Sequence, residues 1–260
     1  MNYRLALFQM DIQLGKPEEN IKKLQESLPV IVEQGCDILV LPELWTTGYD
    51  LSRLRNIVQE EGADVRQMIQ QLAKIYGIHI IAGSIPFKKG ETISNTLLVV
   101  NRDGEEVKHY SKLHLFQLMD EHKFLTSGDT DGLFSLDGET FAGVICYDIR
   151  FPEWIRKHVL LGAKAIFVVA EWPLPRLDHW RTLLQARAIE NQCFVIACNR
   201  AGNDSANTFA GHSMIVNPWG EVIVEASEIE QCIYGTIELD DVERIRQKIP
   251  VFQDRRPEFY

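Results

Sequence analysis

Residues 141–170 read FAGVICYDIRFPEWIRKHVLLGAKAIFVVA. An apolar strand pattern over Phe141–Cys146 is followed by a helical pattern that starts at Pro152 and stops before Gly162. Proline in the first turn and glycine just past the last turn are common helix boundaries. The continuous apolar run over Ala165–Ala170 is typical of a strand buried on both faces. The stretch therefore predicts a strand–helix–strand unit of an α/β protein.

The N-terminal part of the chain repeats this order. A strand pattern over Tyr3–Gln9 precedes a helical pattern over Pro17–Gln34 and an apolar run over Asp37–Leu41. Further helices are expected over Ala63–Tyr76 and Asp178–Asn191, and further strands over Ile78–Ala82 and Cys193–Cys198. This alternation along the whole chain is typical of an α/β fold.

The two halves of the chain also share motifs. Three pairs of stretches recur in the same order: QMDI at Gln9 with CYDI at Cys146, GCDILVLPELW at Gly35 with GAKAIFVVAEW at Gly162, and NTLLVVNRDGEEV at Asn95 with GHSMIVNPWGEVI at Gly211. We infer an internal duplication with pseudo-twofold symmetry, which predicts one domain over residues 1–260 with two packed sheets and helices outside. The alternative is that strand–helix units resemble each other because the same physics shapes each of them.

Composition excludes several classes of protein. The chain has 260 residues, 45% of them hydrophobic, and a formal net charge of −10. An acidic surface repels phosphate backbones, so nucleic acid is not an expected partner. No apolar run approaches the roughly 20 residues of a membrane span, and the N-terminal residues do not resemble a signal peptide. Five cysteines without a CxxC motif fit free thiols in a reducing cytoplasm.

Cys146 is the candidate nucleophile. It ends an apolar strand and precedes polar residues and a helix that begins with Pro152, so its thiol is expected to face a cleft. N–H groups near the helix start are expected to favour the thiolate. The alternative is a small buried hydrophobic residue, which is the usual role of a free cysteine. That alternative is preferred for the four others, Cys36, Cys193, Cys198 and Cys232.

Two charged residues in apolar surroundings are candidates to assist Cys146. Glu43 directly follows a buried strand and a proline, where a carboxylate is costly unless it is paired or used in chemistry. The duplication is expected to bring the turns at Glu43 and Cys146 to one cleft. Lys112 lies among aromatic and apolar residues and could stabilise a developing oxyanion. The alternatives are a surface-loop glutamate and a lysine that protects a strand edge.

Three motifs, taken together, resemble the carbon–nitrogen hydrolase (nitrilase-like) family. They are PELW at Pro42, YSKLHLF at Tyr110 and CYDIRFPE at Cys146, and the resemblance extends over essentially the whole chain. The resemblance implies a four-layer α-β-β-α sandwich with two mixed sheets. It also implies a Glu-Lys-Cys triad, formed by Glu43, Lys112 and Cys146, with Glu121 as a supporting glutamate. A Cys-His pairing through His122 is the alternative. No metal and no cofactor is implied.

The segments CYDIRFPE, AEWPLPRLDHW and ARAIENQ are most similar to the omega-amidase branch of this family. That resemblance implies hydrolysis of omega-amides of 2-oxo acids, such as 2-oxoglutaramate, through a thioester on Cys146 with release of ammonia. The backbone N–H near Tyr147 is expected to help hold the oxyanion, and Trp172 to wall the pocket. Arg150 is the candidate for binding the distal carboxylate, unless it pairs with Asp148 or Glu153. Further candidate cations are Arg176, Arg187 and Arg200.

Other functions remain open at this point. A nitrilase, an N-carbamoyl amidohydrolase or another aliphatic amidase would use the same chemistry on a different substrate. A non-catalytic binding protein and a thiol redox protein are alternatives of other classes. The resemblance also implies a homodimer or a higher homo-oligomer. The C-terminal tail, from about residue 245 and ending IPVFQDRRPEFY, is apolar enough to be expected to pack on its own domain or on a partner subunit.

Overall fold

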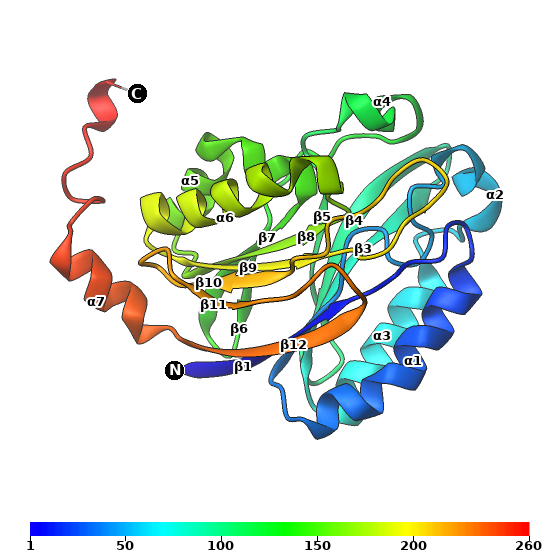
Figure 1. Cartoon of the computed structure of the whole chain (residues 1–260), viewed down its shortest axis with the longest axis horizontal. Helices are drawn as coiled ribbons and strands as arrows, with labels where there is room; N and C mark the ends of the chain where they lie inside the picture. Colours follow the sequence, from blue (N-terminus) through cyan, green and yellow to red (C-terminus); the bar gives the residue numbers. More distant parts are fainter. Residues whose placement is uncertain (260) are drawn as a thin grey trace.

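The computed structural model describes residues 1–259 and consists of two six-stranded sheets packed face to face between outer helices (Figure 1). The first sheet has the order β12 (Gln231–Glu238), β1 (Asn2–Gln9), β2 (Ile38–Val40), β3 (His79–Lys89), β4 (Thr92–Val100), β5 (Glu106–Ser111). The second has the order β11 (Val222–Glu225), β10 (Met214–Val216), β9 (Phe194–Asn199), β8 (Ala165–Ala170), β7 (Glu139–Ile145), β6 (Leu133–Leu136). Each sheet mixes parallel and antiparallel pairs.

Helices cover the outer face of each sheet, as Figure 1 shows. The first sheet is covered by α1 (Pro17–Glu33) and α3 (Ala63–Tyr76), and the second by α5 (Pro152–Leu160) and α6 (Leu177–Asn191). The remaining α-helices are α2 (Leu54–Ile57), α4 (Glu121–Phe124) and α7 (Asp240–Lys248). Leu24 and Leu28 of α1 are fully buried beneath the first sheet, as expected of an amphipathic helix that packs on a sheet. The predicted four-layer α-β-β-α sandwich is confirmed.

The order of the strands repeats between the two sheets. β1, β2 and β3 are parallel neighbours followed by antiparallel β4 and β5, and β7 to β11 follow the same pattern. Strand β6 then pairs with β7, and β12 returns across the molecule to pair with β1. Each sheet is therefore completed by the last strand of the other half of the chain.

Two matching turns repeat in atomic detail. The side-chain oxygen of Asn101 accepts hydrogen bonds from the N–H groups of Asp103 and Glu105, and Gly104 has φ +83°. The equivalent oxygen in the second half is that of Asn217, which accepts from the N–H groups of Trp219 and Glu221 before Gly220 at φ +90°. Glycine at each positive φ lets the turn close without steric strain. These turns match the predicted internal duplication.

The strand predicted over Ile78–Ala82 runs further than the sequence pattern indicates. β3 continues to Lys89 through an irregularity between Ile81 and Ser84. Gly83 lies in this irregularity with φ +57°, and a Cβ atom there would be only 2.0 Å from the carbonyl oxygen of Pro42. The backbone of β3 and the segment that carries Glu43 therefore approach each other very closely.

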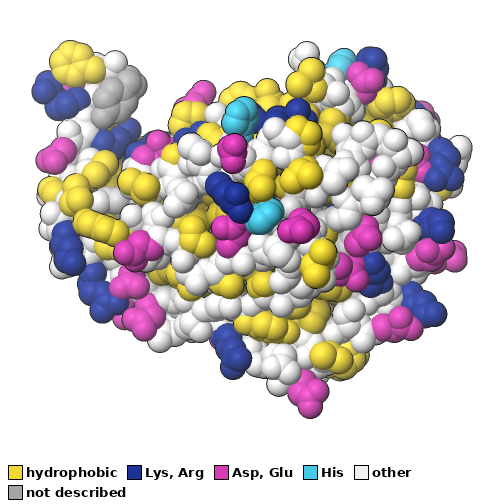
Figure 2. All heavy atoms as spheres, viewed as in Figure 1, with side chains coloured by type: hydrophobic (Ala, Val, Ile, Leu, Met, Phe, Trp, Pro, Cys, Tyr) yellow, Lys and Arg dark blue, Asp and Glu magenta, His cyan; other side chains and the backbone are white. Residues whose placement is uncertain are grey.

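The C-terminal tail follows α7 and stands off the body of the molecule, with a notch between the two (Figure 2). Phe252 lies between the guanidinium groups of Arg156 and Arg246, at 5.0 and 4.7 Å from its ring centroid. A groove of about 1020 Å³ separates the tail from α5. Tyr260, the last residue of the predicted tail, lies outside the described residues. No helix among residues 1–259 is long and apolar enough to cross a membrane.

Candidate active site

The loop after β2 positions Glu43 through contacts with β3. The N–H of Leu44 donates to the hydroxyl of Ser84 at 2.9 Å, and the N–H of Ser84 donates to the carbonyl of Pro42 at 3.2 Å. The indole N–H of Trp45 donates to the carbonyl of Ala82. These bonds turn the chain at the end of β2 and direct Glu43 inward, where it is fully buried.

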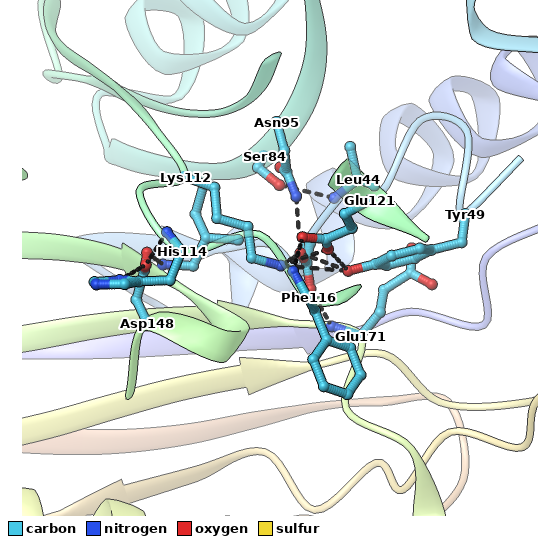
Figure 3. Close-up of polar contacts among 12 residues, drawn as sticks. Leu44, Tyr49, Ser84, Asn95, Lys112, His114, Phe116, Glu121, Asp148 and Glu171 are labelled. Carbon is cyan, nitrogen blue, oxygen red and sulfur yellow. Dashed lines mark hydrogen bonds and ion pairs between the residues drawn. The ribbon is translucent and has the colours of Figure 1, made fainter. Parts of the chain in front are cut away.

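Lys112 joins two buried carboxylates. Its Nζ lies 2.9 Å from Oε1 of Glu43 and 2.6 Å from Oε1 of Glu121, and all three side chains are fully buried. Figure 3 shows the Lys112 and Glu121 side chains pointing toward one another. Charge-assisted bonds of this length are strong when water is excluded. Lys112 reaches this position because it directly follows β5, and its backbone N–H donates to the carbonyl of Asn95 on β4.

Neutral donors complete the polar cluster. The Tyr49 hydroxyl lies 2.9 Å from Oε1 of Glu43 and 2.5 Å from Oε1 of Glu121, and the side-chain amide of Asn95 donates to Glu43 at 2.8 Å. The second oxygen of Glu43 accepts from the backbone N–H of Glu171 at 2.9 Å. Figure 3 shows these groups converging from separate strands and loops. Both oxygens of Glu43 are therefore fixed.

Cys146 forms an elbow between β7 and a short 3-10 helix, η3 (Cys146–Arg150). It has φ +46°, a conformation that residues other than glycine rarely adopt and that often marks a functional site. Asp148 holds the elbow: its Oδ2 accepts from the N–H of Ile145 and the hydroxyl of Tyr110, and its Oδ1 accepts from the N–H of His114. The same carboxylate thus joins the elbow to the chain just after Lys112.

The electrostatic state of Cys146 differs from the sequence-based prediction. Burial raises the pKa of the thiol well above its usual value, and the nearby Glu43 carboxylate raises it further, whereas Lys112 lowers it. The predicted effect of the helix-start N–H groups, which favour the thiolate, does not decide the state of Cys146, because burial and the negative charge of Glu43 outweigh it and keep the thiol protonated.

The two neighbouring groups keep their protons. Burial alone would lower the pKa of Lys112, but Glu121 and Glu43 hold it well above its usual value, so the group stays an ammonium ion. Burial, followed by the same two carboxylates, raises the pKa of Tyr49, which stays a neutral hydroxyl. The cluster therefore contains one cation and two carboxylates beside a neutral thiol.

A narrow cavity leads to Cys146. It measures about 10 Å³ and is lined by Phe116, Met119, Cys146, Tyr147, Arg150, Glu171, Trp172, Pro173 and Arg176. The three predicted substrate-binding residues, Tyr147, Arg150 and Trp172, thus share one cavity with the predicted nucleophile. The Arg150 guanidinium lies 4.8 Å from the ring centroid of Trp172 and has no carboxylate within 4.0 Å among the described residues. The alternative of a salt bridge to Asp148 or Glu153 is therefore not observed.

A model of the carbon–nitrogen hydrolase family matches residues 4–247. The chain belongs to the carbon–nitrogen hydrolase family. The 2-oxoglutaramate amidase of Bacillus subtilis (strain 168) is 50% identical over 260 residues, covering all of both chains. The omega-amidase NIT2 of Homo sapiens is 32% identical, covering all of this chain and 97% of the relative. The crystal structure of Nit3 from Saccharomyces cerevisiae, a member of branch 10 of the nitrilase superfamily, superposes with a TM-score of 0.91 at 27% identity, covering 98% and 97% of the two chains.

Several residues of this carbon–nitrogen hydrolase site were not predicted from the sequence. They are Tyr49, Asn95 and Tyr110, whose side chains bond Glu43, Glu121 or Asp148. Tyr49 follows Glu43 by six residues in the same loop, which is a usable signal. Asn95 and Tyr110 carry no comparable signal. The alternative role for His122 is not supported, since His122 is exposed while Glu121 beside it is buried.

The other two predicted arginine candidates do not line the cavity of this hydrolase. Arg187 donates to the carbonyl of Ile149 and pairs with Glu190. Arg200 is fully buried, pairs with Glu171 at 2.6 Å and stacks on Phe209. Burial raises the pKa of Glu171 to about 8 despite this partner. Arg150 and Arg176 are the two arginines that line the cavity.

Proposed function

We propose that this chain is an amidase that hydrolyses omega-amides of 2-oxo acids, such as 2-oxoglutaramate, through a thioester on Cys146. The observation that carries the proposal is the fully buried Glu43–Lys112–Glu121 cluster beside a thiol at a strained elbow. The full-length similarity to a 2-oxoglutaramate amidase supports the substrate. The Arg150 guanidinium in the cavity suits a substrate that carries a carboxylate.

The reaction begins with a neutral thiol. Glu43 accepts the thiol proton as the sulfur of Cys146 bonds to the amide carbon, so a free thiolate need not accumulate. The oxyanion that forms is stabilised by the ammonium of Lys112 and by the backbone N–H of Tyr147. Glu43 then protonates the leaving nitrogen, the carbon–nitrogen bond breaks, and ammonia departs from the thioester.

Water completes the cycle at the same carboxylate. Glu43 accepts a proton from a water molecule while the oxygen of that water bonds to the thioester carbon. The second oxyanion uses the same two donors, and its collapse breaks the carbon–sulfur bond. The proton on Glu43 returns to the sulfur of Cys146 and the acid leaves. Glu121 supports both stages by holding Lys112, since it accepts from Nζ at 2.6 Å and from the N–H of Phe116 at 2.7 Å.

An assay of ammonia release tests this function. We expect turnover of 2-oxoglutaramate to exceed that of glutamine, asparagine and a simple aliphatic nitrile, and Cys146→Ala to abolish it. Cys232→Ala is a matched control, because Cys232 lies away from the cavity on β12. Comparable turnover of a nitrile or an N-carbamoyl amino acid would assign the chemistry to another substrate class. Wild-type turnover by Cys146→Ala would exclude the mechanism itself.

The two alternatives without hydrolytic chemistry, a thiol redox protein and a non-catalytic binding protein, have less support. A thiol redox role needs a resolving cysteine beside Cys146, but Cys198 donates to the carbonyls of Phe8 and Val40 between the sheets, and Cys193 lies near Arg246. All five cysteines lie in the described chain as free thiols, which suits a reducing cytoplasm. A binding protein without catalysis would not need a buried ammonium between two carboxylates. Labelling of Cys146 by an electrophilic amide analogue distinguishes these cases.

We also propose that the chain folds as one domain and forms a homodimer. The exchange of β6 and β12 between the sheets supports a single domain, because neither half completes its sheet alone. The groove between α5 and the tail is large, and Leu160 and Leu161 beside it are 44% and 55% exposed. A second copy would cover this apolar surface. Light scattering on the full chain and on a variant truncated after Lys248 tests the dimer: a monomeric full chain contradicts it.

A further inference from the structure

Two guanidinium groups enter the cavity of Cys146 from different segments. Arg150 belongs to η3, and Arg176 ends a second 3-10 helix, η4 (Leu174–Arg176), after β8. Arg150 lies over Trp172 at 4.8 Å, and Arg176 lies over Phe116 at 5.4 Å. Stacking uses the flat face of a guanidinium and leaves the N–H groups along its edge available for an oxygen ligand.

Neither cation has a protein counter-ion. Among residues 1–259, no carboxylate oxygen lies within 4.0 Å of the side-chain nitrogens of Arg150 or Arg176, whereas Arg187 and Arg200 are both paired. The polar side-chain contact of Arg150 is with Nδ1 of His179, at 3.2 Å. Burial lowers the pKa of Arg150, and the neighbouring charge of Arg176 lowers it further. Two close, partly buried cations without an anion are unfavourable unless a ligand supplies the negative charge.

The backbone fixes the position of Arg176. Its carbonyl accepts from the indole N–H of Trp172 at 2.7 Å, and its own N–H donates to the carbonyl of Pro173 at 3.1 Å. Trp172 and Pro173 are buried. The side chain of Arg176 therefore projects from a rigid wall of the cavity.

The opposite wall lies nearer the surface of the molecule. It is formed by Phe116 and Met119, and Leu118 between them is 80% exposed. The cavity measures about 10 Å³, close to the space of a single water molecule. A five-carbon amide is far larger, so the cavity must widen when substrate enters. The Phe116 ring in this wall is the one on which the Arg176 guanidinium stacks.

We propose that Arg176 is a specificity-determining residue that joins Arg150 in a two-guanidinium subsite for the substrate carboxylate. When the cavity opens, the guanidinium of Arg176 leaves the ring of Phe116 and binds that carboxylate. The inference rests on the proposed amidase function and deepens it. The substrates that fit are short amides with an anionic group at the far end, namely monoamides of dicarboxylic and 2-oxo acids. Neutral amides of equal length leave both cations without a partner.

Three amides of five carbons separate charge from the other features of the substrate. They are 2-oxoglutaramate, glutaramate, which keeps the carboxylate but lacks the oxo group, and pentanamide, which lacks both. The variants are Arg176→Met, Arg176→Lys and, as a control, Arg181→Met. Arg181 pairs with Glu225 on the surface of α6, outside the cavity.

We expect Arg176→Met to lower kcat/KM for both anionic amides by roughly 10- to 100-fold, the range for loss of one charge-assisted bond, mainly through KM. The loss for pentanamide should be much smaller, so the anionic-to-neutral ratio falls at least tenfold by the same reasoning. Arg176→Lys should restore part of the ratio, because it keeps the charge without the planar fork. Arg181→Met should behave as wild type.

The outcomes separate this inference from the function on which it rests. If wild-type enzyme hydrolyses pentanamide as well as the anionic amides, the proposed substrate class is wrong whatever Arg176 does. If wild type prefers the anionic amides but Arg176→Met keeps the same ratio, the function stands and the role of Arg176 is refuted. An equal loss for all three amides would also refute it, since that is the signature of a structural role.

Discussion

The backbone N–H of Glu171 donates to Oε2 of Glu43 at 2.9 Å. The two residues follow the strands β2 and β8, which lie in different sheets. Oε1 of Glu43 is held by Lys112 and Asn95 from the first sheet, so this single bond ties the carboxylate to the second sheet, which also carries Cys146. The distance between the proposed base and nucleophile therefore depends on how the sheets pack.

Replacing Glu43 by Gln should slow acylation strongly. Glutamine keeps an oxygen for Lys112 but cannot accept the thiol proton, so we expect kcat to fall by about 10²–10⁴, the range for loss of a general base. Single-turnover ammonia release measures this step directly. Glu26→Gln is the control, because Glu26 is an exposed residue of α1. Retained acylation in Glu43→Gln would show that another group accepts the proton.

Glu171 should make stability depend on pH. Its folded pKa of about 8 exceeds its ordinary value of 4.5, so folding binds a proton between these limits. This contribution to stability is fully present below pH 4.5 and is lost as the pH rises through about 8. We expect the free energy of unfolding of wild type, relative to Glu171→Gln, to decrease from pH 5 to pH 8.5.

Urea unfolding of both proteins at several pH values measures that difference. Glu228→Gln serves as the control, since Glu228 is exposed. If the difference stays constant across this range, Glu171 does not bind a proton on folding.

Sequence patterns predicted the layers of the fold because buried strands and amphipathic helices have clear periodicities. They also pointed to Glu43, Lys112 and Cys146, since each lies in a recognisable motif and since Glu43 and Cys146 stand at the ends of predicted strands. Asn95 was not predicted, because its contact with Glu43 depends on how β4 lies against the loop after β2. Local sequence does not specify how these two segments pack against each other.

The charge state of Cys146 could not be predicted for a similar reason. The sequence showed a helix start beside the thiol, which favours a thiolate. It did not show that the thiol would be buried beside a carboxylate, and these tertiary effects dominate its pKa. The lack of a counter-ion for Arg150 was equally invisible, because Asp148 and Glu153 are near it in sequence while Asp148 bonds Tyr110 and His114 in space.

Replacing Lys112 by Met should destabilise the protein as well as inactivate it. The change leaves Glu43 and Glu121 buried without their shared cation, and breaking a buried pair in this way typically costs about 3–5 kcal/mol. Urea unfolding gives the loss of stability. Lys123→Met is the matched control: Lys123 forms an exposed pair with Asp120, and we expect less than about 1 kcal/mol there. Equal stability of the two variants would contradict the cluster as described.

Replacing Asp148 by Asn tests whether the elbow at Cys146 is held by this carboxylate. Asparagine can keep the bonds of one oxygen, but its amide faces either the N–H of His114 or that of Ile145. A buried donor left without an acceptor costs roughly 1–3 kcal/mol, so we expect a loss of stability of that order. Because the elbow holds Cys146 at φ +46°, kcat should fall as well. Asp129→Asn, at an exposed position, controls for the charge. A variant that loses stability but keeps wild-type kcat would show that the thiol is positioned without Asp148.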